Sequence, residues 1–417
     1  MPHFVFAYMF IKSVPPPMRC LSCRLLVVVV MAVVSCSDDE ERLEPVPYQV
    51  LESIVRTDQI TFNEALQGAL QELGVSEEEI EPYRKSVEMA QLRSRAYKAH
   101  IVTYHTTDPY GQPTVASGVV YYPKSGKPRG VIETLSFNKE KFACPSKQIA
   151  NYDLLQGMAG YIVIVADQIG CGATESMVPA YMYFDNVAKV SADLRQAATE
   201  LVRNVYGRSM PSWTLLSGYS WGASEAWALA RYYHFHPELG VQPSQVWIGG
   251  GAYNPLEVMK EQLRTLYTDY AFIPNGIYSV NHYDQLGLDL HDVFRGPLSE
   301  HYEEWCTGDV SVGELSRRLG SDVSQYLNMV FFDDANEDYQ RLCSTVSRLA
   351  IPNDWVPSCP VRIYHGSADT FVPLSSTNIL VEYLQSVGAD VDYQIVEGGH
   401  PECGMAFVSD LIQYLYK

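Results

Sequence analysis

Three side chains in this sequence could together carry out nucleophilic catalysis: Ser220, Asp369 and His400. Ser220 is the centre of a Gly-Tyr-Ser-Trp-Gly segment at 218–222, between an apolar run that predicts a buried strand and small residues that predict a helix. A serine at the apex of a strand–turn–helix unit is typical of a nucleophile elbow. Glycines permit so tight a turn, and the helix N-terminus favours negative charge developing beside the hydroxyl.

A serine nucleophile needs a base within hydrogen-bond reach, and that base needs an orienting acid. Asp369 follows a predicted strand at 361–365, and His400 follows the next one at 390–396, after two glycines. The order Ser, Asp, His is the chain order of α/β-hydrolases. Two alternatives stay open: Glu397 could orient the base in place of Asp369, and His365 competes as the base, although its place at a strand end favours packing.

The chemistry of such a set is acyl transfer. Ser220 would attack an acyl carbonyl, His400 would accept its proton and pass it to the leaving group, and Asp369 would hold the imidazole tautomer. The oxyanion needs two donors. We expect the backbone N–H of Trp221, the residue after the nucleophile, and Ser136 in the loop 135–138 that follows a predicted strand at 130–135.

The elements that must position these residues alternate in type. Predicted strands at 130–135, 161–166, 212–216, 245–248, 361–365 and 390–396 are separated by helical patterns, among them 190–206, 223–230 and a closing helix at 407–416. Two earlier strands, 96–106 and 114–122, form a hairpin pattern. Such alternation predicts an α/β fold with a mostly parallel, doubly wound sheet.

Residues 253–356 interrupt the alternation with helical patterns and no convincing strand. An insertion of this length is too long for a loop, so we expect a helical cap or lid over the C-terminal edge of the sheet, where ligands bind in such folds. The predicted hydrolase core is therefore 96–252 and 357–417. Before it, residues 37–95 read as a tether, up to about residue 60, and an N-terminal helical segment at 66–89 with Gly74 as a stop.

The first 36 residues predict a targeting segment. Arg19 and Arg24 lie before an apolar run at 25–34 that is too short to span a bilayer and suits a signal peptide. Small residues before Cys36 and the acidic run 38–41 resemble bacterial lipoproteins of the Bacteroidetes type, which implies lipidation of Cys36. We expect export and anchoring to the outer membrane or cell surface; a soluble periplasmic or secreted form is the alternative.

Composition excludes some functions. A net charge of -19 disfavours a nucleic-acid partner, because phosphate contacts need a basic face. Six cysteines follow Cys36, and six allow 15 disulfide pairings, so the pattern does not assign them. Their spacing shows no ligand pattern, and we expect neither a metal site nor a cofactor.

Residues 97–417 resemble the secretory lipase family of α/β-hydrolases, lid-bearing lipases and esterases. The resemblance lies in 104–108 with Gly111, in 167–172 with Pro-Ala-Tyr at 179–181, in 218–222, in Asp369 with Val-Pro at 372–373, and in His400-Pro401. The sequence departs from that family at Trp221 and Gln168, where Gln and Tyr are frequent. The resemblance implies a serine hydrolase acting on small-molecule esters or lipids.

Three functions remain in view at this stage. The first is a carboxylic ester hydrolase, an esterase or lipase, working through an acyl-enzyme on Ser220. The second is a serine peptidase of the prolyl-oligopeptidase type, which uses the same triad but has no room here for a propeller. The third is a catalytically dead surface binding lipoprotein. The presence of all three residues, Ser220, Asp369 and His400, argues against it.

Overall fold

The computed structural model describes residues 42–417 except 77, 79, 82–83 and 138–139. The chain divides into the units Met1–Glu44 and Pro45–Lys417, and the fold below is that of the second unit. The predicted signal peptide and Cys36 lie outside the described residues. Among those described, no helix is both long and apolar enough to cross a membrane.

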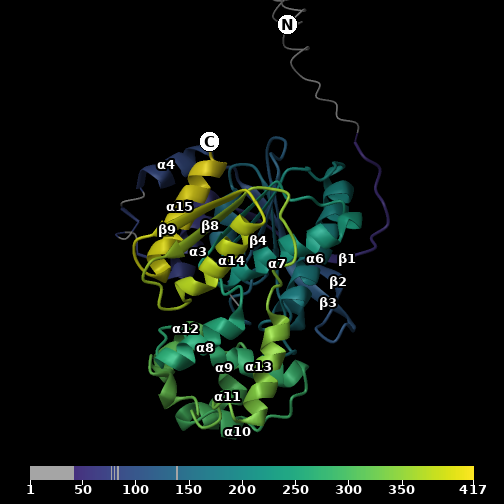
Figure 1. The fold of residues 1–417 in the computed structure, drawn as a ribbon. Helices are drawn as coiled ribbons and strands as arrows, with labels where there is room; N and C mark the ends of the chain where they lie inside the picture. Colours follow the sequence, from purple (N-terminus) through teal and green to yellow (C-terminus); the bar gives the residue numbers. More distant parts are fainter. Residues whose placement is uncertain (1–41, 77, 79, 82–83, 138–139) are drawn as a thin grey trace, which may run out of the picture. The chain divides into compact units, whose positions relative to one another are not determined.

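A nine-stranded sheet forms the centre of the molecule (Figure 1). Its order is β1-β2-β3-β5-β4-β6-β7-β8-β9; the pairs from β1 to β5 are antiparallel, and the pairs from β5 to β9 are parallel. The strands are β1 (Leu51–Ile60), β2 (Tyr97–Thr107), β3 (Pro113–Pro123), β4 (Val131–Leu135), β5 (Ile162–Ala166), β6 (Thr214–Tyr219), β7 (Gln245–Gly249), β8 (Val361–Gly366) and β9 (Val391–Val396).

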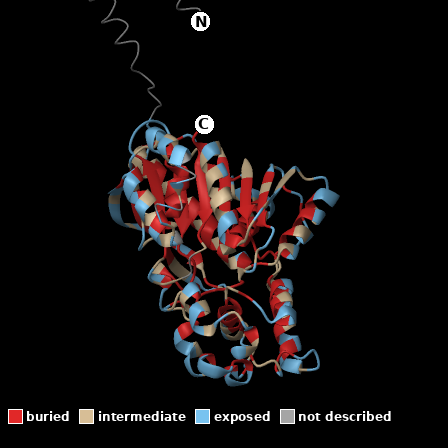
Figure 2. Ribbon diagram, turned by 90° about the vertical axis from the view of Figure 1, so that its left-hand side faces the viewer, coloured by how far each residue is buried: buried red, intermediate tan, exposed pale blue. Residues whose placement is uncertain are grey.

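Helices cover both faces of this sheet, because successive strand residues point to opposite sides and both sides are apolar. In β5, Val163 and Val165 pack on one face, and Ile162 and Ile164 pack on the other. The first face carries α3 (Phe62–Leu73), α4 (Arg84–Arg93), α5 (Tyr152–Gly157) and α15 (His400–Leu415); the second carries α6 (Phe184–Tyr206), α7 (Trp221–Phe235) and α14 (Leu374–Ser386). Figure 2 shows the central strands of the sheet as almost entirely buried, whereas the edge strands β1 and β9 are not.

The insertion between β7 and β8 is helical, as predicted. It contains α8 (Pro255–Thr265), α9 (Ile273–Tyr283), α10 (Leu290–Val293), α11 (Gly296–Trp305), α12 (Val312–Leu319) and α13 (Glu337–Leu349), which lie together at one end of the molecule (Figure 1). These helices bury a core of their own, with Met259, Ile277, Val280, Leu298 and Leu342 at 1% exposure or less. The cap is therefore a packed body rather than a long loop.

Two expectations about the elements were wrong. The tether predicted up to about residue 60 contains β1, which pairs with β2 at the sheet edge and whose mostly exposed residues hid it. The helical segment predicted at 66–89 with Gly74 as a stop is two helices, α3 and α4, and Gly74 ends the first in a left-handed conformation, as predicted. The closing helix begins at His400 rather than at residue 407, so the predicted base stands in the first turn of α15.

Candidate active site

Ser220 occupies the turn between β6 and α7, in a backbone conformation that residues with side chains rarely adopt. Its φ is 58° and its ψ is −127°. The Ser220 N–H donates to the Gly249 carbonyl at 2.8 Å, which ties the turn to the neighbouring strand β7. Strain of this kind persists only where the surroundings fix it, and it is frequent at active sites.

The two glycines of the segment are required by close packing. A Cβ on Gly218 would lie 2.1 Å from the carbonyl oxygen of Gly222. A Cβ on Gly222 would lie 2.0 Å from the carbonyl oxygen of Leu135, at the end of β4. Neither backbone oxygen can move aside without disturbing a strand or a helix. The elbow predicted at 218–222 is therefore present, with Ser220 at its apex.

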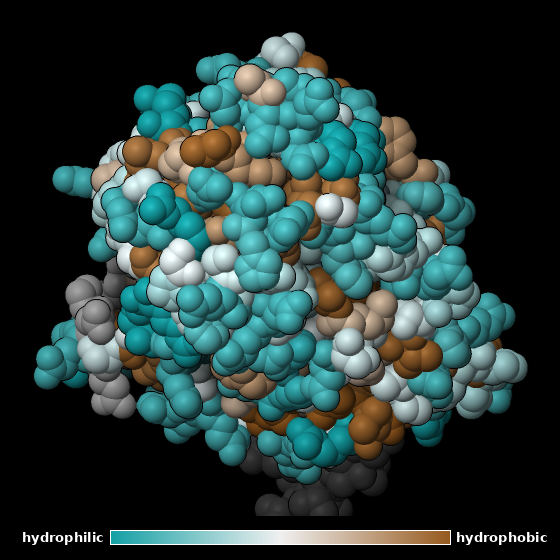
Figure 3. Space-filling model, turned by 90° about the horizontal axis from the view of Figure 1, so that it is seen from below, coloured by the Kyte–Doolittle hydropathy of each residue, from teal (hydrophilic) through white to brown (hydrophobic). Residues whose placement is uncertain are grey.

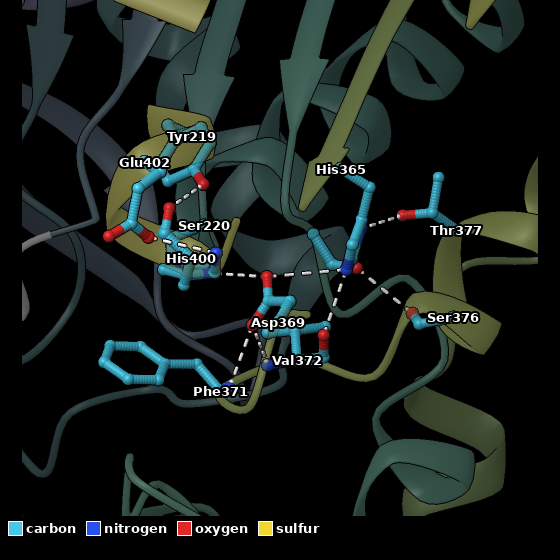
Figure 4. Close-up of polar contacts among 12 residues, drawn as sticks. Tyr219, Ser220, His365, Asp369, Phe371, Val372, Ser376, Thr377, His400 and Glu402 are labelled. Carbon is cyan, nitrogen blue, oxygen red and sulfur yellow. Dashed lines mark hydrogen bonds and ion pairs between the residues drawn. The ribbon is translucent and has the colours of Figure 1, made fainter. Parts of the chain in front are cut away.

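Ser220, His400 and Asp369 form one hydrogen-bonded chain (Figure 4). His400 Nε2 lies 2.8 Å from Ser220 Oγ, and His400 Nδ1 lies 2.7 Å from Asp369 Oδ2. A carboxylate accepts, so Nδ1 carries the proton and Nε2 accepts from the serine hydroxyl. This is the protonation pattern that a general base needs.

The imidazole of His400 is held by packing as well as by hydrogen bonds. The ring of Phe371 stacks on it with centroids 4.9 Å apart, and the ring of Tyr219 lies 5.0 Å away. The Tyr219 hydroxyl donates to the His400 carbonyl, and Glu402 accepts from the N–H of Gly399 at 3.0 Å in a cap of α15. The base is thus fixed in backbone position and in ring orientation.

The side chain of Asp369, in the loop after β8, is fully buried, and donors face both of its oxygens. Oδ1 accepts the N–H groups of Phe371 and Val372, each at 2.9 Å. Oδ2 faces His400, and the Nε2 of His365 lies 3.4 Å from the same oxygen. Donors to a carboxylate favour its charged form, which offsets the cost of burying it.

Neither alternative left open by the sequence takes the place of Asp369 or His400. Glu397 is exposed, whereas Asp369 makes the hydrogen bond to His400. His365 is buried with Nδ1 at 2.7 Å from Thr377 Oγ1, so it packs at the strand end as expected. Cys403, also near the base, is no rival nucleophile, because burial raises the pKa of its thiol to about 11.

The expected oxyanion donors lie around the elbow. Trp221 is the first residue of α7, and an N–H at that position has no partner inside the helix. Ser136 is buried, and its carbonyl carbon would lie 3.4 Å from a Cβ on Gly222. The loop after β4 therefore touches the elbow, while residue 138 lies outside the described part. The roles of Trp221 and Ser136 stay predictions.

Aromatic rings surround the side chain of Trp221. Its ring centroid lies 5.5 Å from that of Tyr181, 5.4 Å from that of Phe184 and 6.0 Å from that of Phe272. Phe272 belongs to the cap and immediately precedes α9. Core and cap thus build an aromatic wall next to the nucleophile.

The sequence did not predict which residues hold His400 and the loop that carries Asp369 (residues 367–373, the acid loop). Tyr219 lies within the elbow segment and Phe371 lies two residues after Asp369, yet nothing in their spacing indicates contact with His400. His365 was placed at a strand end, and its approach to Asp369 was not foreseen. The only indication in the sequence is that Asp369 follows His365 by four positions, with Gly366 between them.

No protein family model matches the chain, and no curated protein sequence matches it either. Solved structures do resemble it. A Legionella pneumophila protein matches with a TM-score of 0.70 and 18% identity over 88% of this chain and 97% of its own. The rice cell wall degrading esterase LipA from Xanthomonas oryzae gives 0.69 and 18%, over 87% and 96%. Candida antarctica lipase A gives 0.56 and 12%, over 84% and 77%.

These identities are low, so the likeness establishes the fold. Together with the strand order and the elbow between β6 and α7, it shows that the chain has the α/β-hydrolase fold with a helical insertion. The predicted fold class is confirmed.

Proposed function

We propose that this protein hydrolyses carboxylic esters through an acyl-enzyme on Ser220. The observation that carries the proposal is the unbroken relay from Ser220 Oγ through His400 to a buried Asp369. His400 Nε2 takes the serine proton as Oγ attacks the carbonyl, and it then gives that proton to the leaving alcohol. Water, activated by the same nitrogen, releases the acid.

Charge on the tetrahedral intermediate would be stabilised at the N-terminus of α7. The Trp221 N–H is one donor, and Ser136 is the candidate for the second. A single donor of this kind contributes about 3 kcal/mol to transition-state stabilisation. The helix dipole of α7 acts in the same direction.

The aromatic wall around Trp221 favours small esters over long acyl chains. Bulky rings surround the side chain of Trp221, the residue after the nucleophile, and one of them, Phe272, comes from the cap. Seen from the cap end, hydrophilic residues separate the apolar ones (Figure 3). Among the described cap residues the exposed large apolar side chains are few and scattered: Leu266, Tyr267, Val330 and Val356. A protein that acts at a lipid surface would expose a continuous apolar patch there.

The structural neighbours support ester hydrolysis in general, since LipA is by name an esterase and the Candida protein is by name a lipase.

The test is turnover of p-nitrophenyl esters of increasing chain length. We expect acetate or butyrate to exceed octanoate in kcat/KM by about tenfold or more. Ser220→Ala should lower kcat by at least about 10⁴-fold and abolish labelling by a fluorophosphonate, with an unchanged unfolding midpoint. A wild-type protein that neither turns over esters nor takes the label would refute the proposal; cleavage of a proline-peptide nitroanilide would favour the peptidase instead.

We also propose, from the sequence alone, that the chain is exported and anchored by a lipid on Cys36. The pattern that supports this lies outside the described residues. Replacing Cys36→Ala should move the protein from the membrane fraction to the soluble fraction of the cell. An unchanged distribution would leave the secretory signal without the anchor.

A further inference from the structure

His365 lies directly behind the acid of the triad. It is the next-to-last residue of β8, its side chain is fully buried, and its Nε2 lies 3.4 Å from Asp369 Oδ2 and 3.0 Å from the Val372 carbonyl oxygen (Figure 4). Its other nitrogen, Nδ1, lies 2.7 Å from the hydroxyl of Thr377 on α14. A histidine this enclosed has its orientation fixed by these neighbours.

The neighbours also fix its tautomer. A carbonyl oxygen only accepts hydrogen bonds, so Nε2 of His365 carries a proton, and Nδ1 accepts from Thr377. Burial lowers the pKa of His365, which keeps the ring neutral. The same Nε2 that bonds the Val372 carbonyl lies 3.4 Å from Oδ2 of Asp369, the oxygen that also accepts from His400.

We propose that His365 is a positioning residue of the triad, whose Nε2–H shares Asp369 Oδ2 with His400 and so limits how basic His400 becomes. The inference rests on the proposed function. Two donors on one carboxylate oxygen each withdraw part of its charge. Without His365, that oxygen interacts more strongly with His400, and the imidazolium becomes more stable.

The titratable groups facing His365 are Asp369 on the loop after β8 and His400 at the start of α15. From α14 it meets the Thr377 hydroxyl, which does not titrate. The effect of removing the imidazole should therefore be read in the ionisation of His400, through Asp369.

The experiment is the pH dependence of kcat/KM for p-nitrophenyl acetate in His365→Phe and His365→Gln. The acidic limb of the kcat/KM profile reports the ionisation of the essential base in the free enzyme. We expect the Phe variant to move this limb upward by about 0.5–1 pH unit, because the shared donor is lost. We expect it also to lose about tenfold in plateau kcat/KM, because Asp369 is less well oriented. The side chain of Gln can place an amide N–H where Nε2 of His365 lies. The acidic limb of the His365→Gln profile should therefore stay near that of the wild type.

A matched control is His100→Gln, which replaces another buried, twice hydrogen-bonded imidazole on β2, away from the triad. Its acid limb should not move. If the Phe variant does not fold, His365→Met removes the donor with a flexible side chain. A folded donor-free variant with lower activity and an unshifted limb means a merely structural role and overturns the inference. A wild type without esterase activity and without fluorophosphonate labelling overturns the proposed function as well.

Discussion

The two carboxylate oxygens of Asp369 have different hydrogen-bond partners. Oδ1 is held by the N–H groups of its own loop, at Phe371 and Val372, while Oδ2 is left for imidazole nitrogens. The loop bonds keep the carboxylate plane fixed, so Oδ2 stays in line with His400 Nδ1. The hydrogen bond from His400 Nδ1 to the acid therefore depends on one atom, Oδ2.

Replacing Asp369→Asn should lower kcat for p-nitrophenyl acetate by about 10⁴-fold. An amide can present its NH₂ group to His400, which then holds its proton on Nε2 and cannot accept one from Ser220. Asp410→Asn is a suitable control, since Asp410 accepts a bond from the Tyr364 hydroxyl at 2.9 Å outside the relay. If the two variants retained similar kcat values, Asp369 would not be the orienting acid.

Sequence order was enough to nominate Ser220, Asp369 and His400, because each follows a recognisable strand or motif. It could not nominate His365 or Tyr219 as partners of the triad. Their contacts arise where the loop after β8 and the first turn of α15 fold back toward the elbow. Such approaches between residues far apart in sequence depend on loop geometry that neither periodicity nor composition records.

At the scale of elements, the cap and the acid loop are joined. Between α8 and α9, Asp269 accepts a bond from the Thr370 hydroxyl at 2.8 Å, and Gln262 Nε2 on α8 donates to the Phe371 carbonyl at 2.9 Å. The rings of Tyr270 and Phe371 stack at 5.2 Å. Since Phe371 also stacks on His400, the cap reaches the base through one intervening ring.

Thr370→Val should lower kcat/KM by about tenfold, with a fall in the unfolding midpoint no larger than that of Ser321→Ala. A hydrogen bond to a charged group is worth about 1.5–3 kcal/mol, and losing part of it at the acid loop corresponds to this change in rate. Although burial alone would raise the pKa of Asp269, bonds from Thr370, Tyr267 and Ser321 lower it, so the carboxylate stays charged.

Ser321→Ala is the control for this change. It removes another 2.8 Å bond to Asp269, made from within the cap, and leaves the contact with the acid loop intact. Its kcat/KM should stay close to that of the wild type. Equal losses in both variants would mean that the cap simply needs Asp269 for its own packing, and that it does not steady the acid loop.

The elements that the sequence predicted well are those with continuous apolar runs, such as β4 and β5, whose five residues each are all buried. β1 escaped notice because only its two end residues, Leu51 and Ile60, are buried and it has a single partner strand. The start of α15 was hidden by Pro401 and Gly404, residues that ordinarily argue against a helix. Pro401 fits there because the second helical position needs no N–H partner.

At the scale of the whole molecule, the sheet edge carries a buried titratable group remote from the active site. His100 on β2 lies opposite Thr57 of β1, with Nδ1 at 2.8 Å from the Thr57 hydroxyl and Nε2 at 2.6 Å from the hydroxyl of Tyr206, the last residue of α6. It links β1 to α6, the longest helix among the described residues. Burial, aided by the charge of Lys98, lowers the pKa of His100 from 6.5 to about 4.

This lowered pKa makes the stability of the protein depend on pH. Below pH 6.5 the unfolded chain binds a proton at His100, whereas the folded protein does not until about pH 4. Stability is therefore lost as the pH falls between these values. Relative to His100→Gln, which keeps polar contacts but cannot titrate, the wild type should lose about 2 kcal/mol of unfolding free energy between pH 7.5 and pH 5.0. Urea denaturation of both proteins at the two pH values measures this difference. Parallel losses in the two proteins would mean that His100 titrates normally and that β1 does not shield it from water.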